Sequence, residues 1–235
     1  MATVILARHG RTTANTSGVL AGRSKGVHLD EHGLGQAKAA GERLTGLPLA
    51  AIVTSPLERC RETAREINRA QAQQLTVASE RRLVECDYGS WTGQEIKSLA
   101  KEPLWKTVQA HPAAAVFPDG ESMAQMMARA VAAVRDWDAR VEAEHGPDAV
   151  WVAVSHGDVI KSVIADALGL HLDLFQRIVV DPSSLSVIRY TALRPFVVSV
   201  NSHAGDLGHL RPPKKRRRGS RRDSDAVVGG GAGSA

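Results

Sequence analysis

The sequence contains little cysteine and no long apolar stretch. Its 235 residues include two cysteines, Cys60 and Cys86, and no CxxC pair, which excludes a disulfide-stapled scaffold and a zinc ribbon. No apolar run approaches the roughly 18 residues of a membrane-spanning helix, and the N-terminal apolar run of about six residues is shorter than a signal-peptide core. We therefore expect a soluble cytoplasmic protein with no membrane contact.

Positive charge is concentrated near the C-terminus. The formal net charge is +5, but residues 208–235 alone carry +6, so the rest of the chain is nearly neutral. The basic charge therefore does not indicate a nucleic-acid binder as a whole. We expect residues 206–235 to be a disordered basic, Gly-rich tail. This tail could attract nucleic acid or an anionic surface, but it lacks aromatic residues that stack on bases, and we favour a solubilising role.

Short apolar runs alternate with helical patterns along the chain. Three of these runs, Thr3–Ala7, Ala51–Thr54 and Ala149–Val154, are each followed by a polar turn and a helical pattern. This alternation predicts an α/β fold with a mostly parallel central sheet. Two further strand-like runs, Ser184–Tyr190 and Phe196–Asn201, come near the end of the predicted domain.

Helix signals follow two of these strands. The sequence SPLE (55–58) has the form of a capping box with proline at the first helical position, which predicts a helix to about residue 70. SHGD (155–158) has a similar form. The core face of a later long helix is predicted at Met123, Met127, Ala130, Val134, Trp137 and Val141. The irregular stretch 85–120 predicts a small cap of short helices and loops.

Basic and histidine residues follow three predicted strands. The first strand delivers Arg8 and His9, the second Ser55 and Arg59, and the third Ser155 and His156. In open α/β sheets, ligands bind beyond the carboxyl ends of the strands. Helix N-termini and arginine side chains at that edge favour an anion such as phosphate.

A histidine beside a phosphate site can also react. A neutral His9 would attack a phosphoryl group and form a phosphohistidine. Arg8, Arg59 and a protonated His156 would hold the equatorial oxygens as charge develops. The two arginines would also disfavour the imidazolium form of His9 and keep it nucleophilic.

The leaving alkoxide needs a proton donor. Glu85 is our candidate, because a nearby phosphate would raise the pKa of its carboxyl group. Asp87 is the alternative. Cys60 and Cys86 adjoin proposed site residues, so redox control competes with simple packing, and we favour buried packing thiols.

Five segments together resemble the histidine phosphatase superfamily, also called phosphoglycerate mutase-like: ARHGRTTAN (7–15), TSPLERCRETA (54–64), ECDYGSWTG (85–93), FPDGES (117–122) and VSHGD (154–158). The resemblance implies a three-layer α/β/α sandwich with a small cap over residues 1–205. It implies His9 as the phosphorylated nucleophile, Arg8, Arg59 and His156 as the phosphate pocket, and Glu85 as the proton donor. It further suggests phosphate or substrate contacts from Gly10, Thr12, Asn15, Gly22 and Ser155. No metal or cofactor is implied.

The superfamily contains phosphatases and mutases. Mutases of this family carry a longer insertion with paired arginines, whereas residues 101–120 here contain no arginine. Arg23 stands near a position where mutases often have an aromatic residue. We therefore favour a metal-independent phosphoric monoester hydrolase acting on a small phosphorylated metabolite over a phosphomutase. A catalytically silent phospho-ligand-binding protein is a third alternative, and a homodimer is one of the oligomeric states that the family leaves open.

Overall fold

The computed structural model describes residues 2–203, so the predicted tail and the domain boundary at 205/206 lie outside the described residues. The strands are β1 Thr3–Arg8, β2 Leu49–Thr54, β3 Val77–Ser79, β4 Val150–Ser155, β5 Leu185–Arg189 and β6 Phe196–Ser202. The α-helices are α1 Thr13–Ser17, α2 Glu31–Arg43, α3 Glu58–Arg69, α4 Ile96–Leu99, α5 Pro103–Ala110, α6 Met123–His145 and α7 Gly157–Ala167. Short 3₁₀ turns are η1 Arg81–Leu83, η2 Gly89–Trp91, η3 Pro112–Ala114 and η4 Leu172–Arg177.

The strands form one sheet in the order β3-β2-β4-β1-β5-β6. Strands β1 to β4 pair in parallel, and β5 pairs antiparallel with both β1 and β6. Arg8 at the end of β1 lies opposite Ser155 at the end of β4. The carboxyl ends of the central strands therefore meet at one edge, as the sequence predicts.

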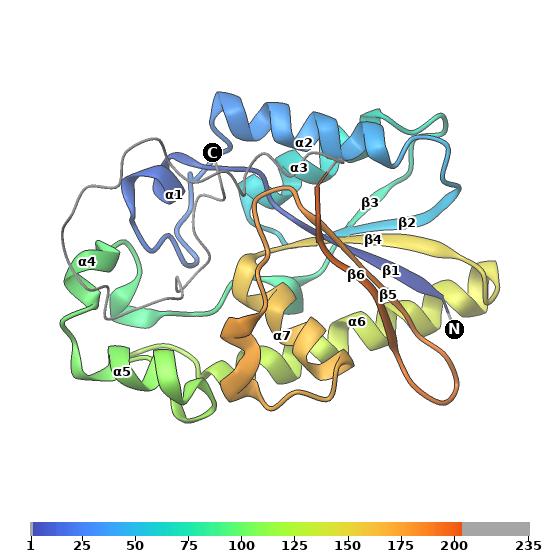
Figure 1. The fold of residues 1–235 in the computed structure, drawn as a ribbon. Helices are drawn as coiled ribbons and strands as arrows, with labels where there is room; N and C mark the ends of the chain where they lie inside the picture. The colour runs from blue at the N-terminus through green and yellow to red at the C-terminus, as the bar shows by residue number, and fades with distance from the viewer. Residues whose placement is uncertain (1, 204–235) are drawn as a thin grey trace, which may run out of the picture.

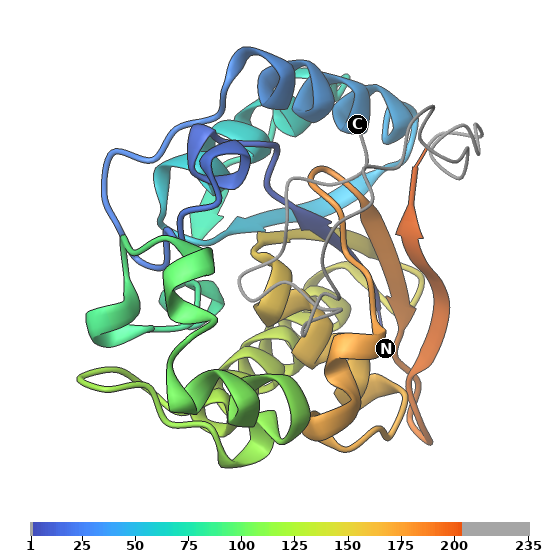
Figure 2. The same cartoon turned by 60° about the vertical axis from the view of Figure 1, so that its left-hand side comes forward.

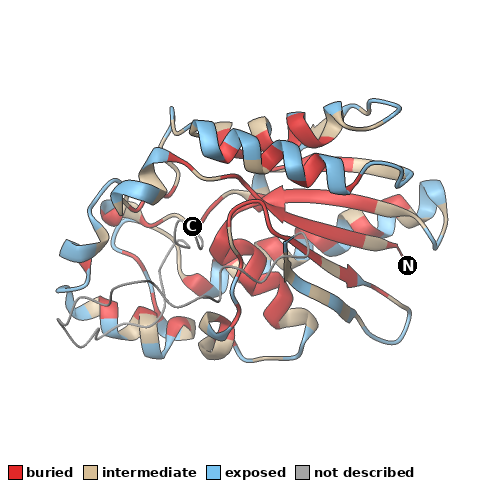
Figure 3. Cartoon of the chain, turned by 45° about the horizontal axis from the view of Figure 1, so that its top comes forward, coloured by how far each residue is buried: buried red, intermediate tan, exposed pale blue. Residues whose placement is uncertain are grey.

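Helices cover both faces of the sheet, which gives the predicted three layers. Alternate residues of β1 point to opposite faces: Ile5 and Ala7 pack with α2 and α3, whereas Val4 and Leu6 pack in the larger core with α6 and α7. Figure 1 shows α2 and α3 above the sheet and α6 and α7 below it, and Figure 2 shows the same sandwich from another side. The central strands are buried almost throughout (Figure 3).

A small cap of short helices covers the carboxyl edge of the sheet. It contains α4, α5 and the 3₁₀ turns between residues 89 and 114, which agrees with the irregular pattern of the sequence. Its interior is aromatic: Trp91 stacks on Trp105 with ring centroids 6.2 Å apart, and Phe117 packs edge-on against Tyr88 at 4.9 Å. This packing holds the segment after Glu85 over the strand ends.

Two predicted helix caps are wrong. Leu57, not Ser55, precedes the first residue of α3, and its side chain makes no capping hydrogen bond. The Ser55 hydroxyl instead lies 2.8 Å from Nε2 of His156. At the start of α7, the Ser155 hydroxyl donates to the Leu83 carbonyl oxygen at 2.8 Å, so neither serine acts as the helix cap.

The long helix forms as predicted, with one shift of its buried face. Met123, Ala130, Val134 and Val141 are buried in α6, as expected. Met126 is buried as well. Met127 and Trp137 are partly buried at the edge of the same core, so the apolar stripe is wider than the predicted spacing.

Candidate active site

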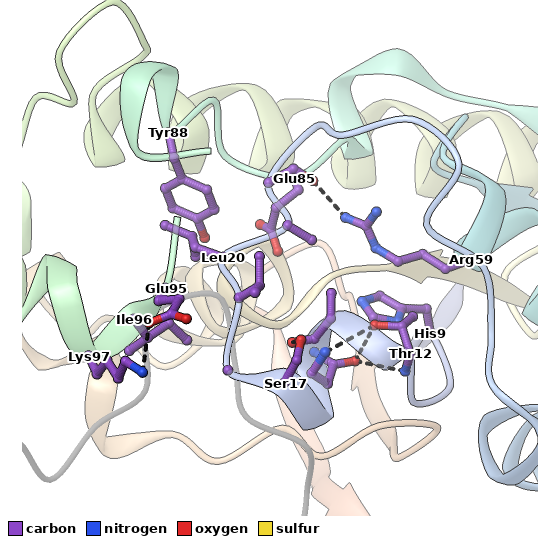
Figure 4. Close-up of a pocket in the computed structure, with 16 residues that line it drawn as sticks. His9, Thr12, Ser17, Leu20, Arg59, Glu85, Tyr88, Glu95, Ile96 and Lys97 are labelled. Atoms are coloured by element: carbon purple, nitrogen blue, oxygen red, sulfur yellow. Dashed lines mark hydrogen bonds and ion pairs between the residues drawn. The ribbon is translucent and has the colours of Figure 1, made fainter. Parts of the chain in front are cut away.

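A cavity of about 310 Å³ opens at the carboxyl ends of the strands. Its lining includes six of the predicted site residues, His9, Thr12, Asn15, Gly22, Arg59 and Glu85. Figure 4 shows His9 and Arg59 on one side and the Glu85 side chain pointing in from the segment above them. The chain therefore brings together a histidine, an arginine and a carboxyl group from three separate segments.

The ring of His9 is held in one orientation by its own backbone. Its Nδ1 lies 2.7 Å from the carbonyl oxygen of Gly10. A carbonyl oxygen can only accept, so Nδ1 carries the proton and Nε2 carries the lone pair of the neutral ring. The amide of Gly10 donates to the Thr63 hydroxyl at 3.1 Å, which fixes this turn to α3.

His9 is kept neutral by its surroundings. Burial lowers its pKa well below 6.5, and the positive charges of Arg59 and Arg8 lower the pKa further. His9 is 3 % exposed. A buried neutral imidazole with its lone pair on Nε2 is a competent nucleophile at neutral pH.

Arg59 is buried and has a hydrogen-bond donor that no described residue accepts. Its side chain comes from the first turn of α3 and donates to the Gly22 carbonyl oxygen at 2.7 Å. Among the described residues, no acceptor bonds its buried Nη1. Buried donors normally find an acceptor, so a phosphate oxygen in the cavity would complete the hydrogen bonding of this guanidinium.

Thr12 and Asn15 shape the loop that follows His9, and Thr12 lies beside His9 in the cavity (Figure 4). The Thr12 side chain caps α1, and the Asn15 side chain accepts from the Thr12 amide at 3.0 Å. This capping box fixes the loop that leads to Gly22, whose φ of +49° and close approach to Tyr88 and Thr92 favour glycine there.

His156 lies behind His9 rather than on the cavity wall. The two ring centroids are 5.3 Å apart. Arg59 approaches His156 Nδ1 at 3.3 Å, and a guanidinium only donates, so the His156 proton is on Nε2 and donates to the Ser55 hydroxyl. Burial, followed by the charges of Arg59, His9 and Arg8, lowers the pKa of His156 well below 6.5.

That neutral state differs from the protonated His156 expected from the sequence. The positive side chains around the ring oppose a further proton, and protonation would require the negative charge of a bound phosphate. The hydrogen bond between Ser55 and His156 is not indicated by the sequence, which predicts a helix-capping role for Ser55.

Three residues for which phosphate or substrate contacts are predicted do not line the cavity. Arg8 is 1 % exposed and donates through Nη1 to the Val180 carbonyl oxygen at 2.7 Å. The Ser155 hydroxyl proton goes to Leu83. The main chain of Gly10 packs closely against Gly33, so that a Cβ at Gly10 would lie 2.4 Å from the Gly33 carbonyl oxygen. Arg8, Gly10 and Ser155 are absent from the residues lining this cavity.

Glu85 has the properties of a proton donor near neutral pH. It is 3 % exposed, and burial together with the charge of Asp158 raises its pKa to about 7. A hydrogen bond from the Cys86 amide and the charges of Arg59 and Arg8 oppose that rise. The Asp158 carboxylate is itself held by the Tyr88 hydroxyl at 2.9 Å.

Asp87, the alternative donor, has a different environment. Its Oδ2 accepts from Arg23 at 3.0 Å, and its Oδ1 accepts from the Gly89 amide at 3.2 Å. It does not line the cavity. The geometry therefore favours Glu85 over Asp87.

The outer cavity contains residues that the sequence analysis missed. Its apolar wall includes Val19, Leu20 and Ile96, and its rim carries Glu95 and Lys97. Lys97 Nζ lies 2.8 Å from Glu95 Oε2. An isolated bridge pairs Val19 with Glu95, a contact between distant segments that no local pattern indicates.

The two thiols are poor redox sensors. Cys60 and Cys86 are both 0 % exposed. Burial raises the pKa of Cys60 to about 12, and burial also raises that of Cys86. Reactive cysteines are thiolates in accessible positions, so both side chains are packing residues. Residues 2–203 contain no group of three or more metal-ligating side chains and no helix able to cross a membrane.

Comparisons with known proteins identify the family of the chain. Residues 4–203 match the family model of the histidine phosphatase superfamily (branch 1). Phosphoserine phosphatase 1 of Hydrogenobacter thermophilus is 32% identical over 215 residues, covering 88% of this chain and 96% of that protein. The probable phosphoglycerate mutase GpmB of Klebsiella pneumoniae is 34% identical over 218 residues, covering 91% and 97%.

The fold also matches solved structures. A mycobacterial glucosyl-3-phosphoglycerate phosphatase superposes with a TM-score of 0.76 at 26% identity, covering 86% of this chain and 99% of the other. YhfR of Bacillus stearothermophilus gives a TM-score of 0.76 at 25% identity, covering 85% and 96%.

Proposed function

We propose that this chain, which belongs to the histidine phosphatase superfamily, hydrolyses a small phosphate monoester through a phosphohistidine at His9. One observation carries the proposal. Three side chains line the same cavity: His9 with its lone pair on Nε2, Arg59 with an unbonded donor, and Glu85 with a raised pKa. Nucleophile, anion ligand and acid are the three groups that phosphoryl transfer to a histidine needs.

In the first step, His9 Nε2 attacks phosphorus and the bond from phosphorus to the ester oxygen breaks. Glu85 gives its proton to the leaving oxygen and becomes a carboxylate. Arg59 donates to the equatorial oxygens and Arg8 adds positive charge, while His156 adds its own only when the bound phosphate has promoted its protonation. Their burial strengthens these interactions.

In the second step, water attacks the phosphohistidine. The Glu85 carboxylate accepts the proton of this water, the bond from phosphorus to Nε2 breaks, and inorganic phosphate leaves. Neutral His9 and protonated Glu85 are restored. The hydrogen bond from Nδ1 to Gly10 persists throughout and keeps the same nitrogen facing phosphorus.

The lining of the cavity favours hydrolysis over phosphoryl transfer within one substrate. Among the described residues that line it, Arg59 is the arginine and Lys97 the lysine. A mutase must hold its substrate through the reorientation step. A cavity without a second arginine supplies less of the required grip on a substrate carboxylate.

The rim indicates the kind of substrate. A bound phosphate at His9 would direct the rest of the ester along Val19 and Ile96 towards the paired charges of Glu95 and Lys97. Relatives carry the names phosphoserine phosphatase and glucosyl-3-phosphoglycerate phosphatase. We therefore expect a small polar phosphate ester with further charged groups.

The test is phosphate release from p-nitrophenyl phosphate, phosphoserine, 3-phosphoglycerate and glucosyl-3-phosphoglycerate, with EDTA present. Wild type is compared with His9→Ala, and His28→Ala is the matched control because His28 is exposed and paired with Glu62. Hydrolysis lost in His9→Ala and kept in the control, with acid-labile phosphate trapped on wild type, supports the proposal.

Other outcomes separate the alternatives. Isomerisation of 3-phosphoglycerate with 2,3-bisphosphoglycerate, without net phosphate release, would identify a phosphomutase. Phosphate binding without turnover and without phosphohistidine would identify a silent binding protein. Two free, buried thiols support our further proposal that the enzyme works in the cytoplasm, which fractionation would check. The homodimer stays a prediction, which light scattering would test by measuring the mass of the protein in solution.

A further inference from the structure

Two arginines from distant segments converge on the main chain of Glu85. Arg23 Nε donates to the Glu85 carbonyl oxygen at 3.0 Å. Arg129, on α6, donates to the same oxygen through Nη2, also at 3.0 Å. Neither arginine lines the cavity that contains the Glu85 carboxyl group.

A single carboxylate joins the two arginines. Glu121 Oε1 accepts from Arg23 Nη2 at 2.9 Å, from Arg129 Nη2 at 2.5 Å and from the Asp87 amide at 2.9 Å. Glu121 Oε2 accepts from Arg129 Nε at 3.0 Å. Burial opposes ionisation of Glu121, but the hydrogen bonds from Arg129 and the Asp87 amide lower the pKa of its carboxyl group overall.

The network extends along the chain on both sides of Glu85. Arg129 Nη1 donates to the carbonyl oxygens of Arg82 and Val84 at 2.6 and 2.7 Å. Arg23 Nη1 donates to Asp87 Oδ2. The backbone oxygens of Arg82, Val84 and Glu85 and the side chain of Asp87 are thus held by charged donors.

The Glu85 side chain needs this support because its own hydrogen bonding is local. Its Oε1 accepts from the amide of the adjacent Cys86 at 2.9 Å, a bond that moves with the main chain. Residues 84–88 form no regular element. The position of the carboxyl group therefore depends on where the main chain is held. Charge-assisted hydrogen bonds are stronger and shorter than neutral ones.

We infer that Arg23, Glu121 and Arg129 form a clamp that positions Glu85 for proton transfer to the leaving group. This inference rests on the proposed function, since it assigns a task to the same acid. The three are positioning residues: they act through the Glu85 main chain and touch no reacting atom. Misplacement of a catalytic group by about 1 Å can cost about 100-fold in rate.

The test exploits the chemistry of the leaving group. p-Nitrophenolate leaves without a proton, whereas the alkoxide of β-glycerophosphate needs one. Arg23→Gln should lower kcat/KM, which reports transfer of the phosphoryl group to His9, by about 10- to 100-fold on β-glycerophosphate and little on p-nitrophenyl phosphate. Glu121→Gln is a second variant with the same expected pattern. Arg43→Gln is the matched control. Arg43 lies at the end of α2, away from the cavity, and it also donates to a backbone oxygen, that of Ser202 at 2.7 Å.

Glu85→Gln distinguishes a failure of the proposed acid from a failure of the clamp. If Glu85→Gln shows no leaving-group dependence, the proposed acid is wrong. If Glu85→Gln shows the dependence in kcat/KM but Arg23→Gln and Glu121→Gln lower kcat/KM equally on both esters, or on neither, the clamp is overturned while the proposed function stands. Thermal unfolding of each variant identifies a loss that comes from misfolding, which slows both esters alike.

Discussion

Replacement of Glu85 by glutamine should make the protein more stable at alkaline pH. The fold raises the pKa of this carboxyl group from 4.5 to about 7. That difference corresponds to about 3 kcal/mol between the two protonation states, at about 1.4 kcal/mol per pKa unit. The main cause is burial, which disfavours the carboxylate, and Asp158 adds negative charge nearby. Arg59 and Arg8 offset part of both effects.

The direction of the pH effect follows from the raised pKa. Below the unfolded value of 4.5, Glu85 is protonated in both states and costs nothing extra. As the pH rises towards about 7, the unfolded chain ionises while the folded chain resists, so wild type loses stability. The glutamine amide of the variant does not ionise in either state. The free energy of unfolding of Glu85→Gln relative to wild type should therefore rise with pH. Above the folded pKa it should be about 3 kcal/mol higher than at acid pH and then stay constant.

Urea unfolding of wild type and Glu85→Gln between about pH 5 and about pH 9 measures this difference. Glu80→Gln is the control, because hydrogen bonds from Arg82 lower the pKa of Glu80 to about 2. Stability from a lowered pKa is present above the unfolded value and is lost only as the pH falls. The Glu80→Gln difference should thus be flat over this range. A flat difference for Glu85→Gln as well would refute the raised pKa and with it the acid assignment.

Four further outcomes are expected. Arg59→Ala should lower kcat/KM on p-nitrophenyl phosphate by about 100- to 1000-fold, since a buried donor at the developing charge is lost; an unchanged value in steady-state assays would remove Arg59 from the site. Gly89→Ala should cost about 2 kcal/mol or more in thermal unfolding, because its φ is +51° and a Cβ would lie 1.9 Å from the Pro118 carbonyl oxygen. Gly93→Ala, at φ +83° with open space around it, should cost about 1 kcal/mol. Peroxide should leave activity intact, because both thiols are buried; inactivation that a thiol reductant reverses would contradict this.

The sequence predicts the layout of the site because strand ends and helix starts are local signals. The run before Arg8-His9 and the run before Ser155-His156 are both buried strands, and the parallel pairing of β1 with β4 brings their ends side by side. Strand β3 escapes notice because Val77–Ser79 is too short to show alternation. The five strands that were predicted are present within a residue or two of their expected bounds.

The contacts that orient the site are not local, and no periodicity reveals them. Ser55 has the sequence context of a helix cap, but it bonds His156, 101 residues away. Arg23 reaches Glu121 across 98 residues. For Ser55 the local preference for a cap yields to a buried partner, and both partners come from tertiary structure that no local pattern indicates.

Buried positive charges at the candidate site oppose folding. Arg8, Arg59 and Lys161 are all at most 6 % exposed, and the fully buried carboxylate near them is Asp158. Burial disfavours the charged forms of Arg8 and Lys161 and lowers the pKa of both side chains. Arg59 also keeps a donor without an acceptor among residues 2–203. A phosphate group supplies negative charge and oxygen acceptors at the same point, so the features that burden the folded state are those that would bind the transferring phosphoryl group.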